Sequence, residues 1–257
     1  MKKPERISQI IETLQATYSA SIRELARKLA VSEMTIRRDL ELLARDNIVR
    51  LVHSGAVLNP ENLGGLQPKY SLTEAGARMA EEKVRIGRRA ASLIEPNDIV
   101  IIDSGSTTEC LARSIPADLP VTVICFALNV LVEAHRNSAC RLVFAGGALH
   151  ENTLMFESPE GAQLVRRYRA NKAFLSASGV SERLGVTCAN SYEVETKKAA
   201  LASSLTRVLL VDSSKFGRIQ PAYFAELTDF ELIITDSGLA PQTAESIRAL
   251  GIELQIV

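Results

Sequence analysis

A glycine stands among four hydroxyl-bearing side chains in the stretch Ser104-Gly105-Ser106-Thr107-Thr108. The stretch follows the apolar run 99–102 and precedes a helical pattern that extends to Ile115, so it joins a predicted strand to a predicted helix. Glycine lets the backbone approach a ligand closely, and hydroxyls with the free N–H groups of a helix start can hold an anion. An ordinary strand-to-helix turn with serine caps explains the same residues. The ending of a Walker loop, Gly-Lys-Thr, is not present in this stretch.

Two lysines and a glycine pair are further candidates for ligand binding. Lys197 lies four residues after Glu193, so both share one face of a predicted helix. A surface ion pair and a lysine directed at a phosphate are both open interpretations. Lys215 follows a predicted strand in a Ser-Ser-Lys-Phe-Gly turn, where a lone exposed lysine often has no special role. The pair Gly146-Gly147 follows another predicted strand and also fits a simple turn.

Residues 21–44 carry a different chemistry, because they predict two short helices joined by a tight turn. Ser32 offers an N-cap hydroxyl to the second helix. The apolar residues of that helix recur at helical spacing and leave Thr35, Arg37 and Arg38 exposed near its start. A helix-turn-helix presents these positions to base edges in the major groove of DNA. The alternative is a helical hairpin whose arginines are only solvated.

A small hairpin is predicted directly after the second helix. Residues 48–52 have strand composition, His53-Ser54-Gly55 forms a turn, and residues 56–58 form the return strand. A hairpin in this position is a wing, with Arg50 and His53 on or near it. The predicted DNA-binding residues are Ser32, Met34, Thr35, Arg37, Arg38, Arg50 and His53.

The rest of the chain predicts the helices, linker and strands that must position these candidate residues. A helix over residues 4–16 completes the head, residues 59–73 form a Pro- and Gly-containing linker, and a long helix is predicted over 74–93. Short apolar runs then alternate with helical patterns, which predicts a parallel sheet covered on both faces, with ligands at the carboxyl ends of its strands. The predicted strands are 99–102, 121–125, 142–145, 173–175, 208–211, 232–235 and 252–257.

The fold class is therefore α/β, with an N-terminal winged helix-turn-helix domain followed by a mostly parallel α/β domain. The predicted division is a DNA-binding domain over residues 1–58, a linker over 59–73, and an effector-sensing and oligomerisation domain over 74–257.

The composition fits a globular protein of the cytoplasm. Apolar residues make up 46% of the 257 positions and charged residues 23%, enough apolar content for one large or two ordinary domains. Of the 30 Lys/Arg and 30 Asp/Glu, residues 1–60 hold 10 and 7, a local net charge of +3 that suits a DNA-binding head. No window predicts a signal peptide or a membrane span.

The cysteines indicate no metal and no disulfide framework. They have no Cys-x-x-Cys spacing and no neighbouring histidine cluster, so we expect reduced and mostly buried thiols. The four are Cys110, Cys125, Cys140 and Cys188.

The stretch VSEMTIRRDLELLARDNIVRLVHSGAV closely resembles the DNA-binding end of the DeoR family of bacterial transcriptional regulators. The later segments EKVRIGRRAASLI, DSGSTT, AGG, LSASGV and DSSKFG, with the Glu193-to-Lys197 spacing, resemble the sensor domain of the same family. The resemblance covers essentially the whole chain in the family's order. Two departures are visible: Ser54 replaces a usual glycine of the wing, and Met155-Phe156-Glu157-Ser158 stand where many members place a serine and a glycine.

The resemblance implies a sheet similar to that of ribose-5-phosphate isomerase and an effector that is a phosphorylated sugar or polyol. By position, Ser104–Thr108 would hold the phosphate, Lys197 and Lys215 would neutralise it, and Asp103 and Glu193 would bind sugar hydroxyls. The expected effector-binding residues are Asp103, Ser104, Gly105, Ser106, Thr107, Thr108, Gly146, Gly147, Glu193, Lys197 and Lys215.

The resulting hypothesis is a repressor of a carbohydrate-utilisation operon, with a double-stranded DNA operator and a phosphorylated sugar as partners. We expect a homodimer or higher homo-oligomer, no cofactor, no metal and no membrane. The alternative is a sugar-phosphate isomerase-like enzyme with an appended DNA-binding domain, in which Asp103, Glu193 and the lysines do acid–base chemistry. No nucleophile–base pair supports that alternative. A helical adaptor for protein partners has only the weak basic bias of the head in its favour.

Overall fold

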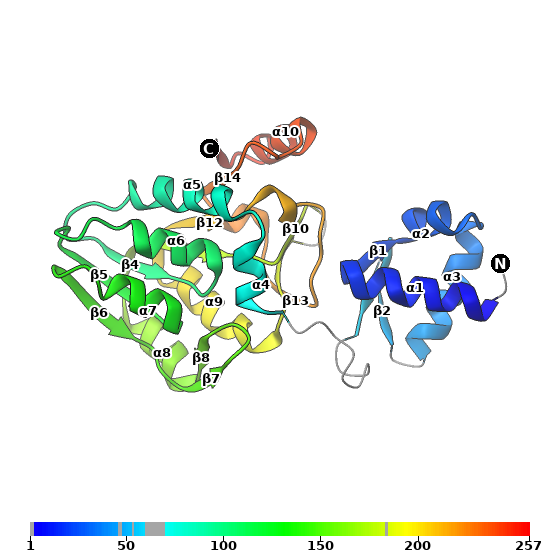
Figure 1. Ribbon diagram of the computed structural model, residues 1–257, viewed down its shortest axis with the longest axis horizontal. Helices are drawn as coiled ribbons and strands as arrows, with labels where there is room; N and C mark the ends of the chain where they lie inside the picture. Colours follow the sequence, from blue (N-terminus) through cyan, green and yellow to red (C-terminus); the bar gives the residue numbers. More distant parts are fainter. Residues whose placement is uncertain (1–2, 46–47, 53, 60–69, 183–184) are drawn as a thin grey trace.

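The computed structural model describes residues 3–45, 48–52, 54–59, 70–182 and 185–257. It shows a small N-terminal head and a larger α/β domain (Figure 1). The head contains three helices and a three-stranded sheet of order β1-β3-β2. Its elements are α1 (Lys3–Thr17), β1 (Ser19–Ser21), α2 (Ile22–Leu29), α3 (Glu33–Arg45), β2 (Val49–Val52) and β3 (Gly55–Leu58).

Local capping explains the two central helices of the head. The Ser21 side chain accepts from the Glu24 N–H at 3.1 Å, and the Glu24 carboxylate accepts from the Ser21 N–H at 2.9 Å, a complete capping box. Helix α2 ends at Ala30, which has left-handed φ and ψ of 51° and 46°. The Ser32 hydroxyl then accepts from the Thr35 N–H at 3.2 Å and starts α3. The predicted helix-turn-helix is confirmed.

The predicted wing is also confirmed. Strands β2 and β3 pair antiparallel from Val49 opposite Leu58 to Val52 opposite Gly55, and β1 adds to the other edge of β3. Asp46-Asn47, whose residue types predict a turn, and His53 lie outside the described residues.

The larger domain is built on a seven-stranded sheet of order β15-β14-β12-β9-β4-β5-β6. Every pairing between its neighbours is parallel, as the apolar runs predicted. The strands are β4 (Ile99–Ile102), β5 (Val121–Cys125), β6 (Cys140–Phe144), β9 (Ala170–Ser176), β12 (Ser204–Leu210), β14 (Leu232–Thr235) and β15 (Glu253–Ile256).

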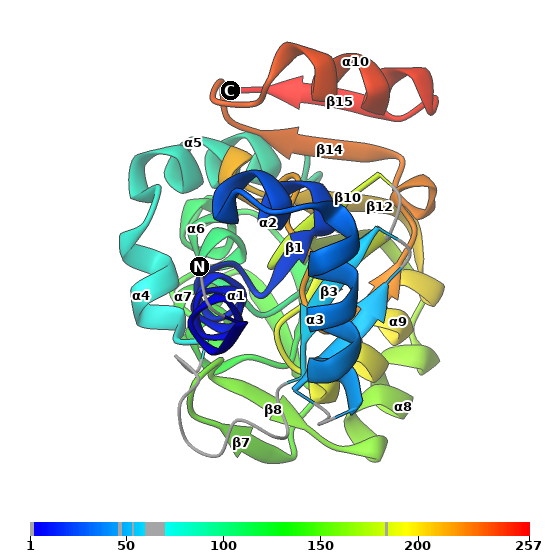
Figure 2. The ribbon, with the colours of Figure 1, turned by 90° about the vertical axis from the view of Figure 1, so that its right-hand side faces the viewer.

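Helices cover both faces of this sheet, because its strands are apolar on both sides. Val100 and Ile102 pack with α5, α6 and α7, whereas Ile101 packs with α8, α9 and α10 on the opposite face. Figures 1 and 2 show α10 at the edge formed by β14 and β15. The helices are α5 (Ala80–Ala91), α6 (Ser106–Ser114), α7 (Leu128–Ala134), α8 (Pro159–Arg167), α9 (Val194–Ala202) and α10 (Pro241–Ala249).

The single helix expected over 74–93 is wrong, since the structure has α4 (Leu72–Ala77) and α5 with a break between them. Met79 adopts a left-handed φ of 53° at the break. The Lys83 ammonium donates to the carbonyls of Ala75 and Arg78 and so holds the chain in this conformation. Helix α4 also begins at Leu72, one residue before the predicted end of the linker at residue 73. The other domain boundaries remain predictions.

Several small elements lie outside the main sheet and were not predicted. Strands β10, β11 and β13 form an antiparallel sheet, and β7 and β8 form a hairpin. They are β7 (Ala148–His150), β8 (Met155–Glu157), β10 (Gly179–Ser181), β11 (Gly185–Cys188), β13 (Ala222–Ala225), η2 (Ser191–Glu193), η3 (Ser213–Lys215) and η4 (Leu227–Asp229). Within the described ranges, no helix has the length and apolarity needed to cross a membrane.

Candidate functional site

The predicted DNA-binding residues of α3 lie on an exposed surface of the head. Arg37 and Arg38 are exposed, Met34 is 59% exposed, and Ser32 caps the helix beside half-buried Thr35. Figures 1 and 2 show α3 on the side of the head that faces away from the α/β domain. The guanidinium groups are therefore available to a DNA groove.

The wing carries two of the predicted DNA-binding residues, Arg50 and His53. Arg50 is exposed on β2, on the same small domain as α3. His53 falls outside the described residues, so its predicted contact with DNA stays a prediction.

An internal ion pair fixes α3, and sequence analysis missed it. Asp39 is 2% exposed and accepts from Arg6 of α1 through both carboxylate oxygens, at 2.6 and 3.2 Å. A bidentate pair of this kind fixes orientation as well as distance. The available signal was the position of Asp39 three residues after Ile36, on the apolar face of the helix.

In the α/β domain, Asp103 lies at the carboxyl end of β4 and is fully buried. Its carboxylate accepts from the Ser176 N–H at 2.8 Å, and the Ser176 hydroxyl oxygen lies 3.2 Å from the same carboxylate oxygen. The Lys197 ammonium also donates to Asp103 and donates to the Ser176 carbonyl at 3.1 Å. Strands β4 and β9 are neighbours in the sheet, and α9 brings Lys197 to their ends.

Glu193 completes a buried charged cluster with Asp103 and Lys197. Its carboxylate lies 3.8 Å from the Lys197 ammonium and accepts from the Asn190 N–H and side-chain amide at 3.1 and 2.9 Å. Burial raises the pKa of Glu193, and Lys197 only partly offsets this. Burial alone would lower the pKa of Lys197, but Asp103 and Glu193 raise it above its usual value. Lys197 is thus neither a surface residue nor an unpaired one.

The glycine of the hydroxyl-rich turn is required by the backbone. Gly105 has a φ of 141°, and a Cβ there would lie 2.7 Å from the Ser176 hydroxyl oxygen. That hydroxyl donates to the Ser104 carbonyl at 2.6 Å, and the Thr108 hydroxyl donates to the Gly105 carbonyl at 3.0 Å. Gly105 is the N-cap of α6 and supplies no side-chain cap. The first-turn N–H groups therefore keep their capacity for an external acceptor.

Ser106 opens α6 and lines a cavity of about 450 Å³ between α4, α5, α6 and α7. Lys83, Arg113 and Asn129 also line it. The Asn129 amide donates to the Gly105 carbonyl at 3.2 Å, while its carbonyl oxygen is buried with no hydrogen-bond partner in the described part of the chain. Hydrogen-bond donors and an acceptor without a partner thus lie beside the hydroxyl-rich turn.

The remaining predicted effector residues lie less close to this cluster. Thr107 is buried in the first turn of α6. Lys215 is half-buried on η3, where burial lowers its pKa and Asp212 opposes the shift. Gly146 and Gly147 pack against the turn before α8, since a Cβ at Gly147 would lie 2.1 Å from the Glu157 carbonyl oxygen. The effector-binding role expected of this glycine pair stays a prediction.

The sequence predicted no role for Lys83 or Tyr70. Lys83 is 2% exposed and lies 3.7 Å from Asp212. The sequence feature that could have indicated its burial is its position three residues before Ile86, on the buried face of α5. Burial raises the pKa of Tyr70, and the nearby charges of Glu193 and Asp103 raise it further. The end of the predicted linker therefore approaches the charged cluster.

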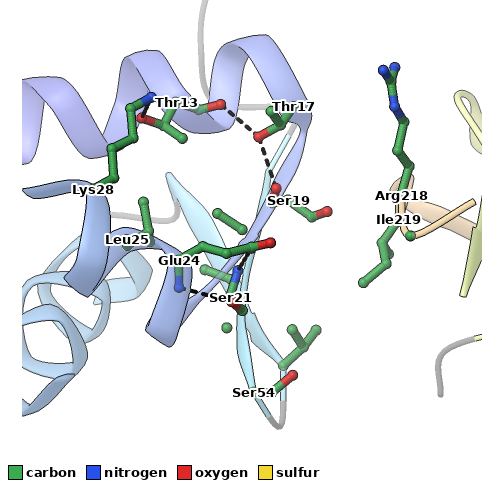
Figure 3. Close-up of a pocket in the computed structure, with 15 residues that line it drawn as sticks. Thr13, Thr17, Ser19, Ser21, Glu24, Leu25, Lys28, Ser54, Arg218 and Ile219 are labelled. Carbon is green, nitrogen blue, oxygen red and sulfur yellow. Dashed lines mark hydrogen bonds between the residues drawn. The ribbon is translucent and has the colours of Figure 1, made fainter. Parts of the chain in front are cut away.

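A second cleft, of about 370 Å³, has walls from both the head and the α/β domain. Figure 3 shows Thr17, Ser19 and Ser21 on the head side and Arg218 with Ile219 opposite them. Arg218 follows η3 by three residues. The loop that carries Lys215 thus extends to the head.

A winged helix-turn-helix with an exposed recognition surface, followed by an α/β domain with a buried polar site, defines a DNA-binding regulator. Residues 6–62 match the family described as DeoR-like helix-turn-helix domain. Residues 78–237 match the DeoR C terminal sensor domain. The chain belongs to the DeoR family of transcriptional regulators, as its sequence predicted.

Curated relatives align over nearly the whole chain. The deoxyribose operon repressor of Escherichia coli K12 is 33% identical over 91% of this chain and 91% of its own. The regulator GolR of Listeria innocua is 31% identical over 98% of both chains. The lactose phosphotransferase system repressor of Staphylococcus epidermidis is 31% identical over 93% of this chain and 94% of its own. Membership of this family favours a regulator over the isomerase-like enzyme.

Solved structures with a similar fold have lower sequence identity to this chain. Ribose 5-phosphate isomerase A of Methanocaldococcus jannaschii is 18% identical, with a TM-score of 0.41 over 54% of this chain and 55% of its own. The full-length sorbitol operon regulator SorC of Klebsiella pneumoniae is 14% identical, with a TM-score of 0.38 over 84% of this chain and 90% of its own. These similarities are too distant to identify a ligand.

Proposed function

We propose that this protein represses a carbohydrate-utilisation operon and that a phosphorylated sugar, bound by the α/β domain, weakens its hold on operator DNA. The relatives named as deoxyribose operon and lactose phosphotransferase system repressors support this role. The observation that carries the ligand assignment is the Asp103–Lys197–Glu193 cluster beside the start of α6, which has no side-chain cap.

The chemistry of this region suits a sugar phosphate. The uncapped N–H groups and the hydroxyls of Ser104–Thr108 would donate hydrogen bonds to the phosphate oxygens, because a helix start attracts anions. Lys197 and Lys215 would neutralise its charge, and Asp103 and Glu193 would accept hydrogen bonds from sugar hydroxyls. Asp103 and Lys197 satisfy each other here, so the ligand exchanges some of these contacts for its own.

The head would bind a double-stranded operator through paired copies of α3. Two recognition helices reach successive major grooves when the protein is a homodimer or a larger homo-oligomer. We place this activity in the cytoplasm, where the four free thiols remain reduced.

A thermal-shift titration tests the ligand assignment. We expect a phosphorylated sugar from a panel including ribose 5-phosphate and 2-deoxyribose 5-phosphate to raise the melting temperature, because a ligand that binds the folded chain stabilises it. Lys197→Met should abolish the shift. Lys172→Met is the matched control, since Lys172 pairs with Asp98 at 2.7 Å at the other end of the strands. A panel without any effect, or a full shift in Lys197→Met, would contradict the proposal.

A further inference from the structure

Helix α4 is the first helix of the α/β domain after the predicted linker, and it has only six residues. A helix this short is not stable by its own hydrogen bonds. Contacts at its two ends must therefore hold it in place. The start is bound next to η2, which carries Glu193 of the charged cluster, and the end is bound by Lys83, which lies near Asp212.

The start of α4 is attached through Asn152. The Leu72 N–H donates to the Asn152 carbonyl at 2.8 Å, and the Asn152 side-chain oxygen accepts from the Tyr192 hydroxyl at 2.9 Å. The ring of Tyr192 stacks on His150, with centroids 3.6 Å apart. Tyr192 directly precedes Glu193 in η2, so a movement of Glu193 is transmitted to the residue that positions Asn152.

The end of α4 is attached through Lys83. Its ammonium donates to the carbonyls of Ala75 and Arg78, the latter at 2.7 Å. The same ammonium lies 3.7 Å from the Asp212 carboxylate oxygen Oδ2, beyond hydrogen-bond distance. That oxygen is buried and has no hydrogen-bond partner among the residues the structure describes.

The Lys83 ammonium can therefore bind either the Asp212 carboxylate or the carbonyls at the end of α4. A buried carboxylate oxygen without a hydrogen bond is unfavourable, and a shift of the ammonium toward Asp212 by about 1 Å would satisfy it. The same shift would weaken the bonds to the carbonyls of Ala75 and Arg78. Two arrangements of Lys83 are therefore close to each other in geometry, and they differ in how firmly α4 is held.

We propose that α4 is the element through which the effector site controls the head: ligand binding draws the Tyr192 hydroxyl away from Asn152, the start of α4 loosens, and Lys83 moves from the carbonyls of Ala75 and Arg78 to Asp212, so that α4 is released. This inference rests on the proposed function, because it takes the charged cluster as the ligand site. A polyhydroxylated anion beside Glu193 competes with Asn152 for the Tyr192 hydroxyl. Since α4 begins within the last residues of the predicted linker, its release changes how the head is tethered.

Hydrogen exchange of the α4 amides in the full-length chain tests this inference. Without ligand, we expect Tyr192→Phe and Lys83→Met each to exchange about five- to tenfold faster in residues 72–77. Tyr192→Phe loses the bond that positions Asn152 at the start of the helix, and Lys83→Met loses the bonds to the carbonyls at its end. The matched controls are Tyr223→Phe on β13, which loses a hydrogen bond to Glu226, and Lys172→Met. Unchanged exchange in both variants would overturn the inference, and Tyr192→Phe decides it if Lys83→Met does not fold.

The ligand arm uses 2-deoxyribose 5-phosphate and ribose 5-phosphate as probes, with inorganic phosphate beside them. A probe that raises the melting temperature should accelerate α4 exchange in the parent chain by a similar factor. If such a probe also weakens operator binding but leaves α4 exchange unchanged, the proposed function stands and this inference fails. If no probe binds, the proposed function fails, and the exchange of the two variants still decides whether Tyr192 and Lys83 hold α4.

Discussion

Charged side chains that have almost no exposed surface fix the geometry of both domains. Asp39 holds α3 against α1 through Arg6, and Lys197 joins α9 to the ends of β4 and β9 through Asp103. A buried charge is tolerated when it is paired and hydrogen-bonded, and removing its partner is strongly destabilising. These residues therefore determine where the exposed arginines and the polar cluster lie.

The buried carboxyl group of Glu193 predicts a pH dependence with a definite sign. Its pKa is raised by burial, so the stability it contributes is complete below its ordinary pKa of 4.5 and is lost as pH rises through the raised value. We expect the free energy of unfolding of the parent chain, relative to Glu193→Gln, to fall as pH increases from acidic to neutral. Urea denaturation across this range measures it. Glu195→Gln, at an exposed neighbouring position, is the control, and parallel profiles for parent and Glu193→Gln would refute the assignment.

The exposed arginines of α3 predict a loss of operator binding. Arg37→Ala or Arg38→Ala should cost about 1–3 kcal/mol of binding free energy where the arginine contacts a base, and should reduce the salt dependence where it contacts a phosphate. Fluorescence anisotropy at several salt concentrations, on a fragment selected from genomic DNA, separates the two cases. Arg88→Ala on α5 is the control. Equal affinity and equal salt dependence for both variants and the parent would exclude α3 as the recognition helix.

Local spacing predicted that these arginines are exposed, but it left open whether Lys197 forms a surface ion pair or binds a ligand. Arg37 and Arg38 follow from the helical period alone, because their exposure depends on residues within the same helix. The partner that buries Lys197 is Asp103, which is 94 residues away, and no spacing pattern reveals such a contact. The same reason explains why Asp212, the neighbour of Lys83, was missed.

At the scale of elements, the strand-to-helix turn at Gly105 connects the sheet to the predicted phosphate site. Gly105→Ala should destabilise the chain by more than about 1 kcal/mol, because the position has a positive φ and its new Cβ meets Ser176. It should also weaken binding of a phosphorylated sugar. Gly146→Ala is the control for stability, since its Cβ would meet nothing closer than 3.9 Å. Calorimetry with and without the sugar measures both effects, and a Gly105→Ala chain as stable as Gly146→Ala would contradict this account of the turn.

Elements governed by a local apolar pattern were predicted well, and those fixed by distant contacts were not. The buried strands, such as Ile99–Ile102 and Leu232–Thr235, coincide with their apolar runs. The break between α4 and α5 could not be predicted, because the helical pattern of the sequence continues through it. The break is held by Lys83 of α5, whose ammonium donates to the Arg78 carbonyl. In the sheet formed by β10, β11 and β13, strand β13 pairs with β11 from more than 30 residues away, and each strand has too few residues for a periodic signal.

At the scale of the whole molecule, DNA and effector are bound by different domains and must influence each other through the connection between them. The charge distribution agrees with this division, since residues 1–60 have a net charge of +3 and the rest of the neutral chain has −3. If a sugar phosphate weakens operator binding, operator DNA must weaken sugar-phosphate binding by the same factor. This reciprocity distinguishes one regulated protein from two independent domains on one chain.

The most direct test is an operator titration of the full-length protein with and without a saturating phosphorylated sugar that raises its melting temperature. We expect the dissociation constant for the operator to rise about fivefold or more, and the affinity for the sugar to fall by the same factor when operator is present. A sugar phosphate that binds the free and the operator-bound protein equally, and leaves the operator affinity unchanged, would contradict the account.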